Sequence, residues 1–279
     1  MSLFVFAAVI FAALLHATWN AVAKSQTDKL LTMTALVFGS SLWGMVALPF
    51  AQWPNPASLV YLAIGILLHI GYQIVLQSAY KLGDLSLVYP ISRGTAPLIV
   101  TIFSVIVWNI EFEFTTILGL AAIIFAVFCL AFTKNSRGGR DGKAIVFALV
   151  TACFIAAYSL VDGTGARLSG DSLGFYACLT IANGFGFAAF IALVKPVNLA
   201  LVFKTQKFIM VFGGLASFGA FAIAMWAFTQ APIALVTALR ESSIMFAMLI
   251  GVVFFKEKFG ALKLVATLAT LAGMVLLRM

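Results

Sequence analysis

Long apolar segments constrain this chain more than any other feature of its sequence. A helix that spans a membrane needs about 20 mostly apolar residues, and ten such segments lie between polar or Pro/Gly breaks. The pattern predicts an all-α integral membrane protein with ten transmembrane helices. The segments are Ser2–Ala23, Leu31–Ala51, Leu59–Tyr80, Leu85–Asn109, Thr115–Thr133, Lys143–Val161, Ser172–Val194, Phe208–Gln230, Ile233–Phe255 and Ala261–Arg278.

The composition agrees with this prediction. Only 9% of the 279 residues are charged, against about 25% in soluble domains, so they cannot cover a water-facing surface. Ten spans would leave about 80 residues for loops and ends, too few for a soluble catalytic or ATP-binding domain. The chain is therefore predicted not to be an enzyme, and no motif in it indicates a cofactor, a metal site or nucleic-acid binding.

The polar stretch 134–143 divides the chain into two halves, predicted as five-helix repeats of residues 1–133 and 144–279 joined by a cytoplasmic linker. The pairs AY at 79–80 and LV at 87–88 match AF at 227–228 and LV at 235–236 at one constant offset. Because five is odd, the second half must enter the membrane from the opposite side. Inverted repeats of this kind are typical of secondary transporters, whose site lies near the bilayer midplane.

Basic residues are distributed unevenly between the two sets of loops. Thirteen Lys or Arg residues follow segments one, three, five, seven and nine, whereas the other side holds only Arg167 and Arg278. Positively charged loops stay in the cytoplasm. We therefore expect a multi-pass protein of the cell inner membrane with both termini on the outer, periplasmic side.

Three charged residues lie deep inside predicted spans. Arg93 is about eight residues into span four, and the pair Arg240–Glu241 is about eight residues into span nine, or about 12 Å from opposite faces. Because these depths are measured from opposite faces of a hydrocarbon core about 30 Å thick, the two positions lie only about 6 Å apart along the membrane normal. The repeat also aligns Arg93 with Glu241. Two cations and one anion are thus predicted to meet at the centre, an arrangement suited to a small anionic or zwitterionic solute.

A structural role for these charges is the alternative. Arg93 or Arg240 could pair permanently with Glu241 and hold spans four and nine together. One arginine would still have no acid in that layer, and a buried unpaired cation needs water, carbonyl groups or a ligand. Glu241 and His16 are the candidates for a proton relay.

Polar residues at helical spacing supply further candidates. Pro90, Gly94 and Pro97 are predicted to break the helix of span four, while Asp162 and Lys24 are interpreted as interfacial and the many phenylalanines as packing or lipid-facing residues. Together with Arg93, Arg240 and Glu241, the predicted substrate-binding residues are Tyr89, Trp19, Asn20, His16, His69, Gln73, Tyr158 and Trp226.

Several of these residues belong to recognisable motifs: APIALVTALRESS at 231–243 with FFKEK at 254–258, LVYPISRGTAP at 87–97 with Glu111, and HATWN at 16–20 with Lys24. On these motifs the chain resembles the EamA-type branch of the drug/metabolite transporter superfamily over essentially its whole length. The resemblance implies a ten-helix fold with a central cavity walled mainly by spans one, three, four, six, eight and nine. It also implies transport of small metabolites such as amino acids and their derivatives, commonly as export.

The predicted function is secondary transport of a small zwitterionic or anionic metabolite by alternating access, with or without a coupled proton. The expected partners are the lipid bilayer and the solute, with the chain working as a monomer. One alternative is a proton-coupled exporter of organic cations or drugs, in which Glu241 exchanges the proton. An alternative of another class is a membrane sensor or partner subunit without transport.

Overall fold

A computed structural model describes residues 1–26, 28–82, 85–131, 142–194, 199–255 and 260–278, and every regular element within these ranges is helical. The first half holds α1 (Leu3–Ser25), α2 (Lys29–Ala47), the short helices η1 (Leu48–Phe50) and η2 (Pro56–Ser58), α3 (Leu59–Leu82), α4 (Leu85–Ile106) and α5 (Phe114–Ala131). The second half holds α6 (Gly142–Leu168), α7 (Ser172–Val194), α8 (Leu199–Thr205), the π-helix η3 (Ile209–Gly213), α9 (Gly214–Gln230), α10 (Ile233–Arg240), α11 (Ser243–Phe255) and α12 (Ala261–Arg278).

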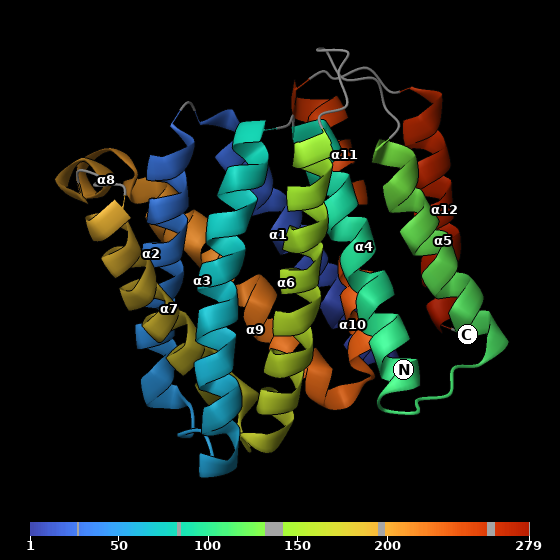
Figure 1. The fold of residues 1–279 in the computed structure, drawn as a ribbon, viewed down its shortest axis with the longest axis horizontal. Helices are drawn as coiled ribbons and strands as arrows, with labels where there is room; N and C mark the ends of the chain where they lie inside the picture. The colour runs from blue at the N-terminus through green and yellow to red at the C-terminus, as the bar shows by residue number, and fades with distance from the viewer. Residues whose placement is uncertain (27, 83–84, 132–141, 195–198, 256–259, 279) are drawn as a thin grey trace.

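The long helices run up and down through one bundle, and the two chain termini lie at the same end of it (Figure 1). Side chains define where helices start: Ser2 caps α1, and the Asp28 carboxylate accepts hydrogen bonds from the backbone N–H groups of Leu30 and Leu31 at the start of α2. These caps satisfy backbone donors that have no partner within the helix. They place helix boundaries close to those predicted from the sequence.

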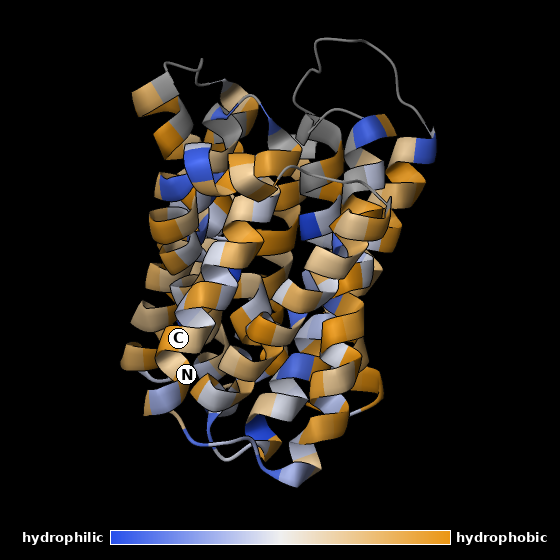
Figure 2. Ribbon diagram, turned by 90° about the vertical axis from the view of Figure 1, so that its left-hand side faces the viewer, coloured by the Kyte–Doolittle hydropathy of each residue, from blue (hydrophilic) through white to orange (hydrophobic). Residues whose placement is uncertain are grey.

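The bundle has the surface of a membrane protein. Seven helical stretches of the described residues are long and apolar enough to cross a membrane, and three shorter apolar helices, Ile91–Ile106, Phe114–Cys129 and Leu264–Arg278, accompany them. Large apolar side chains such as Phe4, Leu193 and Phe254 are more than 70% exposed, which water would disfavour and lipid accepts. Apolar residues cover most of the helix length, while hydrophilic residues gather toward the two ends with a few at mid-height (Figure 2).

Helix α6 is longer than predicted. The predicted segment ended at Val161, but the helix continues to Leu168, because the glycines that suggested a break serve close packing instead. A Cβ atom at Gly165 would collide with the ring of Phe175 and with Tyr61. The extension places Asp162 inside the helix and inside the protein, so its interpretation as an interfacial residue is wrong: Asp162 is fully buried.

The predicted helix break in span four is also wrong. Helix α4 is continuous from Leu85 to Ile106 in spite of Pro90 and Pro97, since neighbouring helices and hydroxyl groups compensate for a proline in a membrane helix. The interruption lies in the other half, where α10 ends at Arg240 and α11 begins at Ser243. This break faces the centre of the bundle, because α10 packs against α1, α4, α6 and α9.

Candidate functional site

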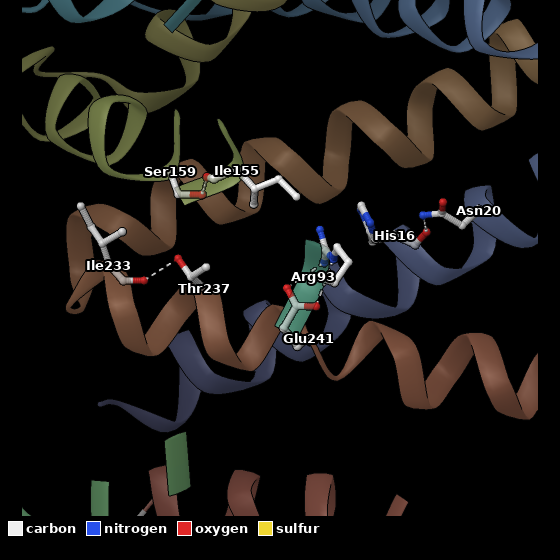
Figure 3. A network of polar contacts seen from close by, with 8 residues as sticks. All are labelled: His16, Asn20, Arg93, Ile155, Ser159, Ile233, Thr237 and Glu241. Atoms are coloured by element: carbon white, nitrogen blue, oxygen red, sulfur yellow. Dashed lines mark hydrogen bonds and ion pairs between the residues drawn. The ribbon is translucent and has the colours of Figure 1, made fainter. Parts of the chain in front are cut away.

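Two of the predicted charged residues form a buried ion pair between the halves of the chain. Arg93 of α4 binds Glu241 at the end of α10 in a side-on arrangement, with Nε to Oε2 and Nη2 to Oε1 both 3.0 Å (Figure 3). The two residues are 7% and 3% exposed. Paired, charge-assisted hydrogen bonds of this kind are among the strongest polar contacts in proteins. The structure thus contains the pair that the sequence offered as the structural alternative, with Arg93 as its cation.

Arg240 remains outside this pair. Its guanidinium lies over the ring of Phe221, with Cζ 4.6 Å from the ring centre, which is within the range of a cation–π contact. The side chain is buried, and its Nη2 has no hydrogen-bond partner in the described part of the chain. Because Arg93 and Glu241 neutralise each other, these three residues carry a net charge of plus one, and Arg240 is its source.

The break between α10 and α11 lies directly beside these charges. Backbone N–H groups of Glu241 and Ser242 donate to carbonyls only three residues earlier, those of Ala238 and Leu239, at 3.0 Å. The hydroxyl groups of Ser242 and Ser243 are buried and have no partner among the residues that the structure describes. Discontinuous membrane helices with exposed polar groups form solute sites in transporters.

Helix α1 brings three predicted residues to the same region. The His16 ring packs edge-on against Trp19 at 5.0 Å and against Phe221 at 6.1 Å between ring centres. His16 Nδ1 and Trp19 Nε1 are buried without a partner in the described ranges. Asn20 differs, because its amide donates to the His16 carbonyl of its own helix at 2.7 Å (Figure 3).

A second buried pair links α3 to α6. His69 Nε2 and Asp162 Oδ2 are 2.7 Å apart, and the ring of Tyr158 stacks on His69 with 4.3 Å between centres and 23° between planes. Gln73, one turn further along α3, is buried, and its Oε1 has no partner in the described residues. His69, Gln73 and Tyr158 were predicted from spacing, whereas the carboxylate that holds His69 was assigned to the membrane interface.

One predicted residue, Trp226, falls outside this assembly. Trp226 lies more than a turn beyond Phe221 on α9, and its ring packs edge-on against Phe4 at 5.5 Å. The side chain of Tyr89 is outside the described residues, as are the side chains of Gln77 and Lys24.

Phe221 is the residue that sequence reasoning missed. Its ring contacts His16, Arg240, His69 (6.4 Å) and Tyr176 (6.0 Å, nearly parallel), so four helices meet at one side chain. The repeat contained a signal: the offset of 148 residues that aligns Arg93 with Glu241 also aligns Phe221 with the polar Gln73. Phenylalanine is so abundant in this chain that its type alone carried no information.

The comparisons with known proteins describe the fold and nothing further. No protein family model and no curated protein matches the chain. A solved crystal structure superposes on 99% of this chain and 96% of its own, with a TM-score of 0.77 at 18% sequence identity. The fold is therefore one found in solved structures, and the chain is an all-α protein with apolar helices that can cross a membrane and a charged, aromatic centre.

Proposed function

We propose that the chain is a ten-span secondary transporter of the EamA-type branch, built from two inverted five-helix repeats. The packing supports the repeat, because contacts occur in exchangeable pairs. Helix α3 packs on α6, and their counterparts in the other half, α9 and α1, also pack on each other. Helix α4 packs on α6, and its counterpart, α10 with α11, packs on α1. The remaining counterparts pack directly on each other, α2 on α7 and α5 on α12. Arg93 and Glu241, at equivalent positions of the halves, meet each other across the centre.

The observation that carries the proposed function is the uncompensated Arg240 beside the Arg93–Glu241 pair. A buried cation without an acid is costly, and an anionic group of a solute would compensate it. The N–H group of Trp19 and the hydroxyl groups of Ser242 and Ser243, all buried without partners in the described ranges, are further donors nearby in the fold. We infer that a small zwitterionic or anionic metabolite, such as an amino acid or a derivative, binds here.

The remaining site residues have distinct roles in this proposal. Glu241 can accept an additional hydrogen bond from a solute amino group, because a carboxylate has about four acceptor positions and Arg93 takes two. His16, Trp19, Tyr158 and Phe221 form the aromatic wall. The organic-cation alternative is less favoured, since both oxygens of Glu241 are already bonded to Arg93.

Alternating access requires an element that can change conformation. The break at Glu241–Ser242 divides one span into two short helices, and in transporters one repeat or bundle rocks against the other around a site built on such discontinuous helices. We place the protein in the inner membrane as a monomer surrounded by lipid, with both termini on the periplasmic side. The shared end of the two termini in Figure 1 and the uneven distribution of basic residues along the sequence support this orientation.

The test is ligand-dependent thermal stability in detergent, followed by flux in lipid vesicles. A panel of amino acids, aminophosphonates, carboxylates and organic cations is compared on the wild type, Arg240→Gln and the control Thr237→Ala. Thr237 is buried one turn earlier, and its hydroxyl donates to the Ile233 carbonyl of its own helix, its one hydrogen bond in the described part of the chain. A bound ligand at a hundred times its dissociation constant adds about 2.7 kcal/mol.

We expect an anion or zwitterion to raise the melting temperature of the wild type and of Thr237→Ala, and to have no effect on Arg240→Gln. The same solute should cross vesicles that contain wild-type protein, with flux reduced at least about 100-fold by Arg240→Gln. Stabilisation by organic cations alone would favour the drug-exporter alternative. Absence of flux for every member of the panel would favour a sensor or partner subunit.

A further inference from the structure

The pair of His69 and Asp162 is a second buried ionisable centre that the solute site does not use. Asp162 is fully buried and His69 is 8% exposed, and their contact joins two uninterrupted helices, α3 and α6. Gly65, one turn before His69, makes room for the carboxylate: a Cβ atom there would press on Asp162 Oδ1. The backbone is therefore shaped around this pair.

A purely structural role explains the pair poorly. Buried ion pairs seldom stabilise a protein relative to apolar residues of the same size, and here the second carboxylate oxygen, Oδ1, has no partner in the described residues. Histidine is the side chain whose charge changes most readily between pH 5 and 8. Ionisable residues buried in membrane helices are typical of proton pathways.

The His69–Asp162 pair lies close to the solute site, and the Phe221 ring contacts both. The Phe221 ring centre lies 6.4 Å from the His69 ring centre and 4.6 Å from Arg240 Cζ. Because both distances are measured to the same point, the two groups are at most about 11 Å apart. The phenyl ring lies against both of them, and no hydrogen bond or ion pair between the pair and Arg240 is present in the described residues.

Glu241 is less suited to carry a proton. One of its oxygens accepts a hydrogen bond from Arg93 and the other lies in ion-pair contact with the same guanidinium, and arginine does not give up its own proton in proteins. Protonating Glu241 would weaken this hydrogen bond and ion-pair contact and leave Arg93 without its acid. The Asp162 carboxylate meets a histidine instead, and histidine can lose the proton again.

Resting on the function proposed above, we propose that the His69–Asp162 pair binds the proton that is transported together with an anionic solute. With the proton, an imidazolium faces a carboxylate and the pair is neutral. Without it, a neutral imidazole donates to the carboxylate and the pair carries one negative charge, which partly compensates Arg240. Proton binding therefore strengthens the attraction of Arg240 for an anion, and by linkage a bound anion strengthens proton binding.

The other ionisable groups on the surrounding elements do not change the sign of this effect. Arg93 and Glu241 cancel each other, and tyrosines are neutral near pH 7. A unit charge at about 11 Å and an effective dielectric constant of about 20 changes the affinity for another unit charge roughly tenfold. The groups with described side chains on α3, α4, α6, α7 and α10 are Tyr61, Tyr72, Lys81, Arg93, Lys143, Cys153, Tyr158, Arg167, Tyr176, Cys178, Arg240 and Glu241. His16 of α1, whose ring contacts the same Phe221 ring, would add a positive charge on protonation and therefore acts in the same direction.

The experiment uses vesicles that contain the full chain and a mixture of radiolabelled L-amino acids as the probe. Two processes are measured. The first is exchange of labelled amino acids outside the vesicles for unlabelled ones inside, with equal pH on both sides. The second is accumulation of labelled amino acids driven by a pH gradient. Asp162→Asn keeps a hydrogen-bonding side chain and copies the charge of the proton-loaded pair. Ser159→Ala is the control, because Ser159 lies one turn away on α6, is buried, and within the described residues donates only to the Ile155 carbonyl of its own helix.

For wild type and Ser159→Ala, we expect gradient-driven accumulation and an exchange rate that falls by up to about tenfold as the pH is raised, at limiting probe concentration. Asp162→Asn should keep exchange within about threefold of the wild-type rate at pH 6, show no pH dependence, and lose accumulation. Wild-type accumulation in this variant would overturn the proton assignment and leave the proposed function intact.

Loss of both processes by a variant that elutes and melts like the wild type would make the pair a structural contact and also overturn the assignment. The double variant His69→Gln/Asp162→Asn, which has no ionisable group at this pair, replaces Asp162→Asn should that variant fail to fold. Absence of exchange by wild-type protein would overturn the proposed transport function itself. The two failures are thereby distinguishable.

Discussion

Two buried ion pairs lie within the described part of this bundle, and they differ in how completely each is satisfied. In the Arg93–Glu241 pair, both carboxylate oxygens are bonded, and the pair lies against a helix break. In the His69–Asp162 pair, one oxygen is bonded, and both helices are continuous. The comparison suggests a division of roles: a fixed pair that positions the site, and a pair whose charge can change.

The largest effect is expected from removing one partner of the fixed pair. Glu241→Gln should lower the free energy of unfolding by about 3–5 kcal/mol, because it leaves two buried arginines without an acid. The melting temperature in detergent measures this loss. The double variant Arg93→Leu/Glu241→Leu should recover most of it, since it removes charge and counter-charge together. A double variant as unstable as the single one would mean that packing at α10, not charge, holds this region together.

A smaller effect is expected where the second pair meets the backbone. Gly65→Ala should cost about 1–3 kcal/mol, because the added methyl group would displace the Asp162 carboxylate that His69 holds in place. Gly219→Ala is the matched control: its methyl group would meet only Leu15, at an ordinary 3.5 Å. Thermal denaturation of the two variants compares them directly. Equal stabilities would show that the carboxylate can move without cost.

The smallest effect is expected at the ring between the two centres. Phe221→Leu removes the face over which Arg240 lies but keeps an apolar side chain, and a cation–π contact is worth about 0.5–2 kcal/mol. The solute affinity of Phe221→Leu, measured in the ligand-dependent stability assay, should differ from that of the wild type by a factor of about two to thirty. Phe185→Leu, on the exposed surface at 67% exposure, should leave affinity unchanged. An affinity equally insensitive to both changes would remove Phe221 from the site.

The helices were largely predictable because bilayer thickness and hydrogen bonding restrict what an apolar segment can do. Predicted segments such as Leu59–Tyr80 and Ser172–Val194 agree with α3 and α7 to within about two residues. The errors came from Gly and Pro, whose usual reading as helix breakers fails in this bundle. Pro90 and Pro97 lie inside α4, and Gly163 and Gly165 lie inside α6.

The candidate site was predictable in its residue types but not in its pairing. Charge inside an apolar segment is conspicuous, so Arg93, Arg240 and Glu241 could be selected from sequence. Which arginine takes the carboxylate depends on where α4 and α10 cross, and no local pattern encodes that. Asp162 lies next to a segment end in the sequence, and only the continuation of α6 shows that it is buried.

The sequence by itself determined the class of this protein: apolar segments of membrane length, few charges, and polar residues at helical spacing require helices that bury their own backbone hydrogen bonds. The tertiary structure decided which polar groups satisfy one another. Packing places Arg93 on Glu241, leaves Arg240 over Phe221, and joins His69 to Asp162. The physical reason is that helix formation depends on neighbours within a few residues, whereas compensation of a buried charge depends on partners brought close by the fold.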